Sequence, residues 1–175
     1  MENFHLILPE IFISLSIMFL LILGVFKKNS SELIHNMSLV VLLITAVITF
    51  NETIDIQKKM LFNESIVIDY LTSLMKIITL LAAFIVLAIS KNYLKILKIF
   101  KIEYPVLVLS SILGMMIMIS SNDLIVFYMG LELQSLALYV LATFNRDNLK
   151  SSEAGLKYFV LSALSSGLLL YGCSL

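Results

Sequence analysis

Residues 124–144 read LIVFYMGLELQSLALYVLATF, a stretch in which Glu132 is the single residue with a charged side chain. An α-helix rises about 1.5 Å per residue, so a stretch of this length covers a hydrocarbon core of about 30 Å. Backbone polar groups find no water inside a bilayer, and a helix satisfies them internally. The stretch therefore predicts a membrane-spanning helix with a carboxyl group near its middle.

The composition of the whole chain agrees with this prediction. Of the 175 residues, 60% are hydrophobic and 14% are charged. A compact soluble domain of this size cannot bury so much apolar surface, and a disordered chain would be far more polar. The net charge is zero, so the chain lacks the excess of basic residues that is typical of nucleic-acid-binding proteins. We predict an all-α fold, a polytopic membrane helix bundle with six transmembrane helices at about 8–26, 33–50, 70–90, 104–120, 124–144 and 154–175.

The basic residues of the connections predict an orientation. Eight follow the first, third and fifth spans: Lys27, Lys28, Lys91, Lys95, Lys98, Lys101, Arg146 and Lys150. The opposite side has Lys58 and Lys59. Because basic loops stay on the cytoplasmic side, we expect both ends of the chain on the outside.

Two connections have patterns of their own. Residues 59–69 contain two short apolar runs around Asn63-Glu64, which predicts a small hairpin on the outer surface. Residues 93–101 place lysines among apolar residues, which fits either an amphipathic segment at the inner interface or a plain basic loop.

Glu132 is the leading candidate for a functional residue. It lies eight residues into its span, about 12 Å deep, where a glutamate is too short to reach the interface. Tyr128, Ser135 and Tyr139 share its helix face and form a possible supporting polar face. Such a carboxyl group can carry a proton across the membrane or hydrogen-bond two helices together. We favour proton translocation.

Three other ionisable residues lie within predicted spans. Lys157 is about one turn into the sixth span, where it either reaches the interface or faces the bundle and acts on a nearby acid. Lys76 has a similar position in the third span, and snorkelling to the interface is the favoured interpretation. Glu10 follows Pro9, an arrangement that suits the N-terminus of a helix and its dipole. The sequence leaves the roles of Lys76 and Glu10 open.

Residues 121–141, SNDLIVFYMGLELQSLALYVL, and 152–172, SEAGLKYFVLSALSSGLLLYG, resemble the fifth and sixth helices of the antiporter-like membrane subunits of respiratory complex I. Leu8-Pro-Glu10 and the absence of a bulky aromatic residue before Glu132 favour one branch of that family. The resemblance implies that Glu132 is an intramembrane carboxylate in proton translocation and that Lys157 is its supporting cation. It implies no catalytic, cofactor-binding or metal-ligating residue here, because flavin, iron–sulfur clusters and quinone belong to other subunits.

The same resemblance implies an architecture and a setting. Such subunits have about fourteen spans in two inverted repeats, so we expect a single membrane domain over 1–175. Residues 1–103 would form a three-helix part, and 104–175 the first part of a truncated repeat. The expected partners are other membrane-arm subunits and the lipid bilayer, without nucleic acid. The expected place is the bacterial inner membrane, with the mitochondrial inner membrane as the alternative.

Two other functions compete with a proton-translocating subunit of NADH:quinone oxidoreductase. One is a subunit of a multi-component cation/proton antiporter. The other is a structural or assembly membrane protein, in which Glu132 would only hold helices together.

Overall fold

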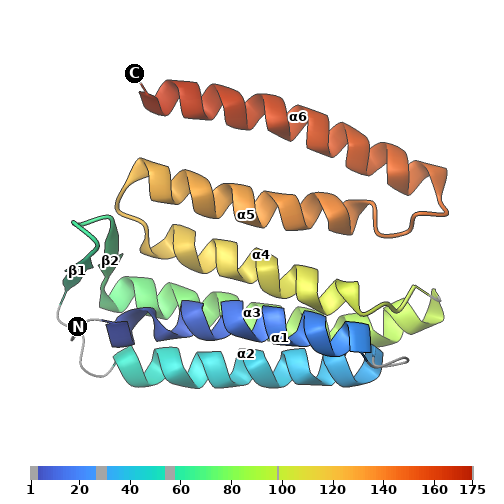
Figure 1. Cartoon of the computed structure of the whole chain (residues 1–175), viewed down its shortest axis with the longest axis horizontal. Helices are drawn as coiled ribbons and strands as arrows, with labels where there is room; N and C mark the ends of the chain where they lie inside the picture. Colours follow the sequence, from blue (N-terminus) through green and yellow to red (C-terminus); the bar gives the residue numbers. More distant parts are fainter. Residues whose placement is uncertain (1–3, 27–30, 54–57, 98, 175) are drawn as a thin grey trace.

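The chain forms a stack of long antiparallel helices (Figure 1), seen in a computed structural model that describes residues 4–26, 31–53, 58–97 and 99–174. A short 3₁₀ helix, η1 (Phe4–Ile7), leads into the first long helix. The long helices are α1 (Leu8–Phe26), α2 (Ser31–Thr53), α3 (Tyr70–Ile96), α4 (Glu103–Ser120), α5 (Leu124–Ala142) and α6 (Leu149–Ser174). All six are long and apolar enough to cross a membrane. The predicted all-α membrane bundle is confirmed.

The helix bounds differ modestly from the prediction. α3 extends to Ile96 rather than ending at residue 90, and α6 begins at Leu149 rather than at residue 154. Helices continue past the apolar stretch because lysine and glutamate are good helix formers in the polar interface. As a result, Tyr93–Ile96 is the last turn of α3, and the described residues 99–101 form a loop.

The helices alternate in direction, which gives the bundle two distinct ends (Figure 1). A two-stranded antiparallel sheet, β1 (Lys59–Leu61) and β2 (Ile66–Ile68), lies at the end where α1, α3 and α5 begin. We call this the hairpin end. The opposite end, with Lys91, Lys95, Lys101, Arg146 and Lys150, is the basic end. Lys27, Lys28 and Lys98 lie outside the described residues.

The predicted hairpin is confirmed, and it is anchored. Phe62, Asn63 and Glu64 adopt positive φ angles in its turn. The Asn122 backbone N–H donates to the Ser65 carbonyl at 2.9 Å, and its side-chain amide donates to the Glu64 carbonyl at 2.8 Å. The hairpin is thereby bonded to the turn between α4 and α5.

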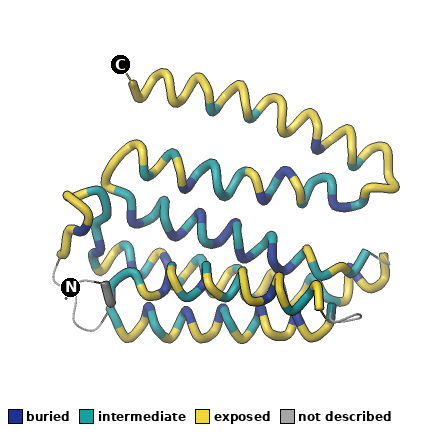
Figure 2. Tube along the Cα trace, viewed as in Figure 1, coloured by how far each residue is buried: buried dark blue, intermediate teal, exposed yellow. Residues whose placement is uncertain are grey.

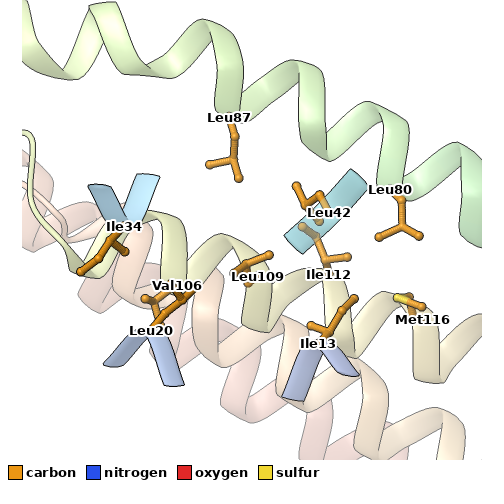
Figure 3. Close-up of a cluster of buried hydrophobic side chains, with 10 residues drawn as sticks. All are labelled: Ile13, Leu20, Ile34, Leu42, Leu80, Leu87, Val106, Leu109, Ile112 and Met116. Atoms are coloured by element: carbon orange, nitrogen blue, oxygen red, sulfur yellow. The ribbon is translucent and has the colours of Figure 1, made fainter. Parts of the chain in front are cut away.

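The core lies between the first four helices, where α4 packs against both α1 and α3 (Figure 3). Its fully or nearly fully buried side chains come from all four helices: Ile13, Leu20, Ile34, Leu42, Leu80, Leu87, Val106, Leu109, Ile112 and Met116. α5 covers the other side of α4, and α6 packs mainly on α5 (Figure 2). Most of α6 is exposed, and Gly155 is its one fully buried residue.

Candidate functional site

Glu132 lies in the middle of α5, on a helix with a defined start. The Asp123 carboxylate accepts a hydrogen bond from the Ile125 N–H at 3.3 Å and so caps the helix. The Glu132 side chain is half-buried, and its Oε1 atom is buried without a hydrogen-bond partner among the described residues. Buried polar atoms are nearly always paired. This carboxyl oxygen therefore has unused capacity to accept a hydrogen bond or hold a proton.

Two glycines set the position of Glu132 against α4. A Cβ on Gly114 would lie 2.6 Å from the Gln134 backbone nitrogen and 2.7 Å from the Gly130 carbonyl oxygen. A Cβ on Gly130 would lie 3.0 Å from the Gly114 carbonyl oxygen. The two helix backbones thus touch directly on either side of Glu132, as small residues allow in membrane helices.

The polar face predicted around Glu132 divides between two environments. Ser135 donates to the Leu131 carbonyl of its own helix at 2.6 Å. The buried Tyr139 ring packs edge-on against Tyr158 and Phe159 of α6, with centroids 4.8 and 5.6 Å away. Tyr128 is half-buried. Tyr139 therefore orients α5 toward α6, and no described hydrogen bond links these three side chains to Glu132.

Lys157 forms an ion pair within α6. Its Nζ lies 2.5 Å from Glu153 Oε1, and the two side chains are 66% and 64% exposed. Tyr158 is level with Tyr139, which is seven residues, or about 10 Å of helix, from Glu132. Among the described residues, Lys157 is therefore not brought to Glu132, and its role as a supporting cation stays a prediction.

Lys76 and Glu10 form a second ionisable pair, this one buried. Lys76 Nζ lies 2.5 Å from Glu10 Oε1, and the side chains are 4% and 12% exposed. Lys76 does not extend to the interface, because its partner lies inside the bundle. Glu10 does more than begin a helix, since its charge compensates the buried ammonium group. The snorkelling interpretation of Lys76 is therefore wrong, whereas Glu10 does lie in the first turn of α1, as the sequence predicted.

Glu52 is a third member of this group that sequence reasoning overlooked. It is half-buried in the last turn of α2 and interacts electrostatically with Glu10 and Lys76. A sequence signal did exist: Glu10, Glu52 and Lys76 lie near the same end of their respective spans. No group of three or more His, Cys, Asp or Glu residues suited to a metal ion occurs among the residues that the structure describes.

Comparisons with known proteins bear directly on the stretch that contains Glu132. A family model described as "NADH:quinone oxidoreductase/Mrp antiporter, TM" matches residues 121–175. The protein named NADH-quinone oxidoreductase subunit N from Pelagibacter ubique is 71% identical over 175 residues, 100% of this chain and 37% of its own length. The protein of that name from Maricaulis maris is 52% identical, with 99% and 36% covered. The chain is similar to subunit N from end to end.

The likeness to subunit N confirms the branch that Leu8–Glu10 and Gly130–Leu136 favoured. The chain spans about a third of the length of these relatives. A chain in a structure of respiratory complex I from Thermus thermophilus with bound aureothin shares the fold, with a TM-score of 0.78 and 23% identity. That match covers 94% of this chain and 35% of the other. This structural likeness shows a shared fold.

Proposed function

We propose that this protein is a proton-translocating membrane-arm subunit of NADH:quinone oxidoreductase and that Glu132 carries the proton. The observation that supports this most directly is the buried Oε1 of Glu132, which has no hydrogen-bond partner among the described residues and lies in a helix long and apolar enough to cross a membrane. Close backbone contact at Gly114 and Gly130 fixes α5 against α4. The Glu132 carboxyl group is therefore held inside the protein while it takes up and releases a proton.

Lys157 has a supporting role in this proposal. Its ion pair with Glu153 is exposed, and exposed pairs are weak, so Lys157 can change partner at little cost. The described face of α6 leaves room for further protein to pack on it. In this role, Lys157 acts on the charge state of the proton path near the basic end.

The cofactors and partners follow from the same proposal. Flavin, iron–sulfur clusters and quinone are bound by other subunits, and this chain contributes no redox centre. Its partners are other membrane-arm subunits and the lipid bilayer, and nucleic acid is not one of them. We place the protein in the bacterial inner membrane, with the hairpin end outside and the basic end in the cytoplasm, as the distribution of Lys and Arg favours.

The experiment that tests this function is Glu132→Gln in the assembled enzyme. The amide keeps hydrogen-bonding capacity but has no titratable proton to release and take up. Proton pumping is expected to fall to about a hundredth or less, since removing a positioned proton-transfer group typically costs roughly 10²-fold or more. Glu64→Gln, in the exposed hairpin turn, is the matched control. Unchanged pumping per electron in Glu132→Gln, with normal assembly, would refute the role.

The family model also names Mrp antiporters, so a cation/proton antiporter subunit is the second candidate. The two functions separate by their driving force. A complex I subunit pumps when NADH is oxidised, whereas an antiporter subunit moves protons in response to an imposed cation gradient. Proton movement in membrane vesicles, driven by each in turn, distinguishes them.

A further inference from the structure

Helices α1, α2 and α3 each contribute one residue to a buried ionisable cluster at the hairpin end. Glu10 comes from α1, Glu52 from α2 and Lys76 from α3, and these three helix ends converge next to the hairpin (Figure 1). The cluster belongs to a different part of the fold from Glu132, which lies on α5. We propose that Glu10, Glu52 and Lys76 form a second proton-binding site, which holds one exchangeable proton.

The first step of the argument is the balance of charge. Lys76 is 4% exposed and pairs with Glu10 Oε1, so one carboxylate compensates its charge. Glu52 then brings a second carboxyl group, which Glu10 repels and Lys76 attracts. Two carboxylates and one ammonium group would leave a net negative charge in a largely buried place. Uncompensated buried charge is costly. One proton shared between the two carboxyl groups removes the excess negative charge.

The second step is a place for that proton. Glu10 Oε2 is buried without a hydrogen-bond partner among the described residues, while Oε1 of the same group accepts from Lys76. A carboxylate oxygen in that position gains a hydrogen bond by protonation or by facing a protonated neighbour. The Glu10–Lys76 ion pair therefore leaves one carboxylate oxygen, Glu10 Oε2, available to bind a proton.

The third step is the direction of exchange. Toward the basic end, the following turns of the three helices hold Ile13, Thr49, Thr45 and Leu80, whose exposed fractions lie between 0% and 2%. Thr49 donates to the Thr45 carbonyl and Thr45 to the Val41 carbonyl, so both hydroxyl groups donate within α2. Glu52 is half-buried in the last turn of α2, at the hairpin end of the bundle. Protons enter and leave this site from the hairpin end.

Infrared titration of the assembled enzyme in membranes tests the proposal. The signal is the C=O band of protonated carboxyl groups, recorded as pH rises and compared between variants. Relative to wild type, Glu52→Gln and Glu10→Gln should each lose one titrating carboxyl group. Lys76→Met should gain one, because both acids then hold protons. Glu64→Gln, an exposed glutamate at the same end, should leave the band unchanged.

The outcomes are distinct. If Glu52→Gln and Glu10→Gln titrate like Glu64→Gln, no proton is shared and the proposal is wrong. If Glu10→Gln fails to assemble, Glu52→Gln decides alone, since Glu52 forms no described ion pair with Lys76. The double variant Glu10→Lys with Lys76→Glu exchanges the two partners and keeps the ion pair. Its C=O band should therefore match that of the wild type. Because the band reports proton occupancy and not pumping, the result does not depend on Glu132.

Discussion

At the scale of single residues, burial decides what an ion pair in this protein does. The Lys76–Glu10 and Lys157–Glu153 pairs have equal nitrogen–oxygen distances, 2.5 Å, but the first is buried and the second exposed. Removing one partner of a buried pair leaves an uncompensated charge, whereas removing one partner of an exposed pair leaves a solvated one. The Lys76–Glu10 pair is therefore expected to stay together, whereas Lys157 can leave Glu153 and pair with another group.

Lys157 substitution tests that freedom. We expect Lys157→Arg to keep most proton-pumping activity, because the positive charge remains, and Lys157→Ala to lose activity several-fold. Glu153→Gln should have little effect, since it removes only the exposed partner. Pumping rates of the assembled enzyme provide the measurement.

Lys150→Ala is the control for this series, because Lys150 is also an exposed lysine near the start of α6. If Lys157→Ala pumps as well as Lys150→Ala, Lys157 is an interfacial anchor and has no part in proton transfer.

At the scale of helices, close backbone contact depends on glycine at particular positions. Gly114 brings α4 onto α5, and Gly155 brings α6 against Thr143 at the C-terminal cap of α5, where an added Cβ would clash with Cγ2. Gly167, which also lies in α6, has nothing within 4 Å of an added Cβ. A small residue in a span thus marks a possible contact, and the neighbouring helix determines whether the contact exists.

Gly114→Ala is expected to destabilise the bundle by about 1–3 kcal/mol, the usual cost of forcing an extra methyl group into packed structure. The clash is with the backbone of α5, so side-chain rotation cannot relieve it. Thermal unfolding of the purified protein in detergent measures the effect, and proton pumping should fall with it because Glu132 moves with α5.

Gly167→Ala is the matched helix-interior control and should be neutral or slightly stabilising, because alanine favours helix by up to about 1 kcal/mol. Equal stability of the two variants would show that α4 and α5 are not in backbone contact.

At the scale of the whole molecule, the two ends of the bundle carry different chemistry. The hairpin end has the buried Glu10–Lys76 pair and the strand turn, and the basic end has exposed lysines, one of which, Lys91, donates to Asn36 at 2.9 Å. This asymmetry predicts the orientation in the membrane.

Cysteine labelling tests the orientation. In a Cys173→Ser background, a cysteine at Asn63 should react with a membrane-impermeant thiol reagent added outside intact cells. A cysteine at Lys101 should react only after the cells are opened. Both positions are exposed in the structure, so access to the reagent depends on the membrane side. The reverse pattern would invert the proposed topology.

The sequence by itself determined the spans, the hairpin and the likeness to complex I subunits. These features are local: apolar length predicts a membrane helix, and the two short apolar runs around Asn63-Glu64 predict a hairpin. Glu132 was recognisable for the same reason, since its depth follows from counting residues along one helix.

The tertiary structure alone decided which charges meet. Glu10 and Lys76 are 66 positions apart in the chain, and their contact depends on how α1 and α3 turn toward each other, which no helical spacing records. The same holds for Gly114 with Gly130, and for Lys157, whose exposed side chain pairs with Glu153 of its own helix. Depth in the membrane is a property of one helix, whereas a buried partner is a property of two helices packed together.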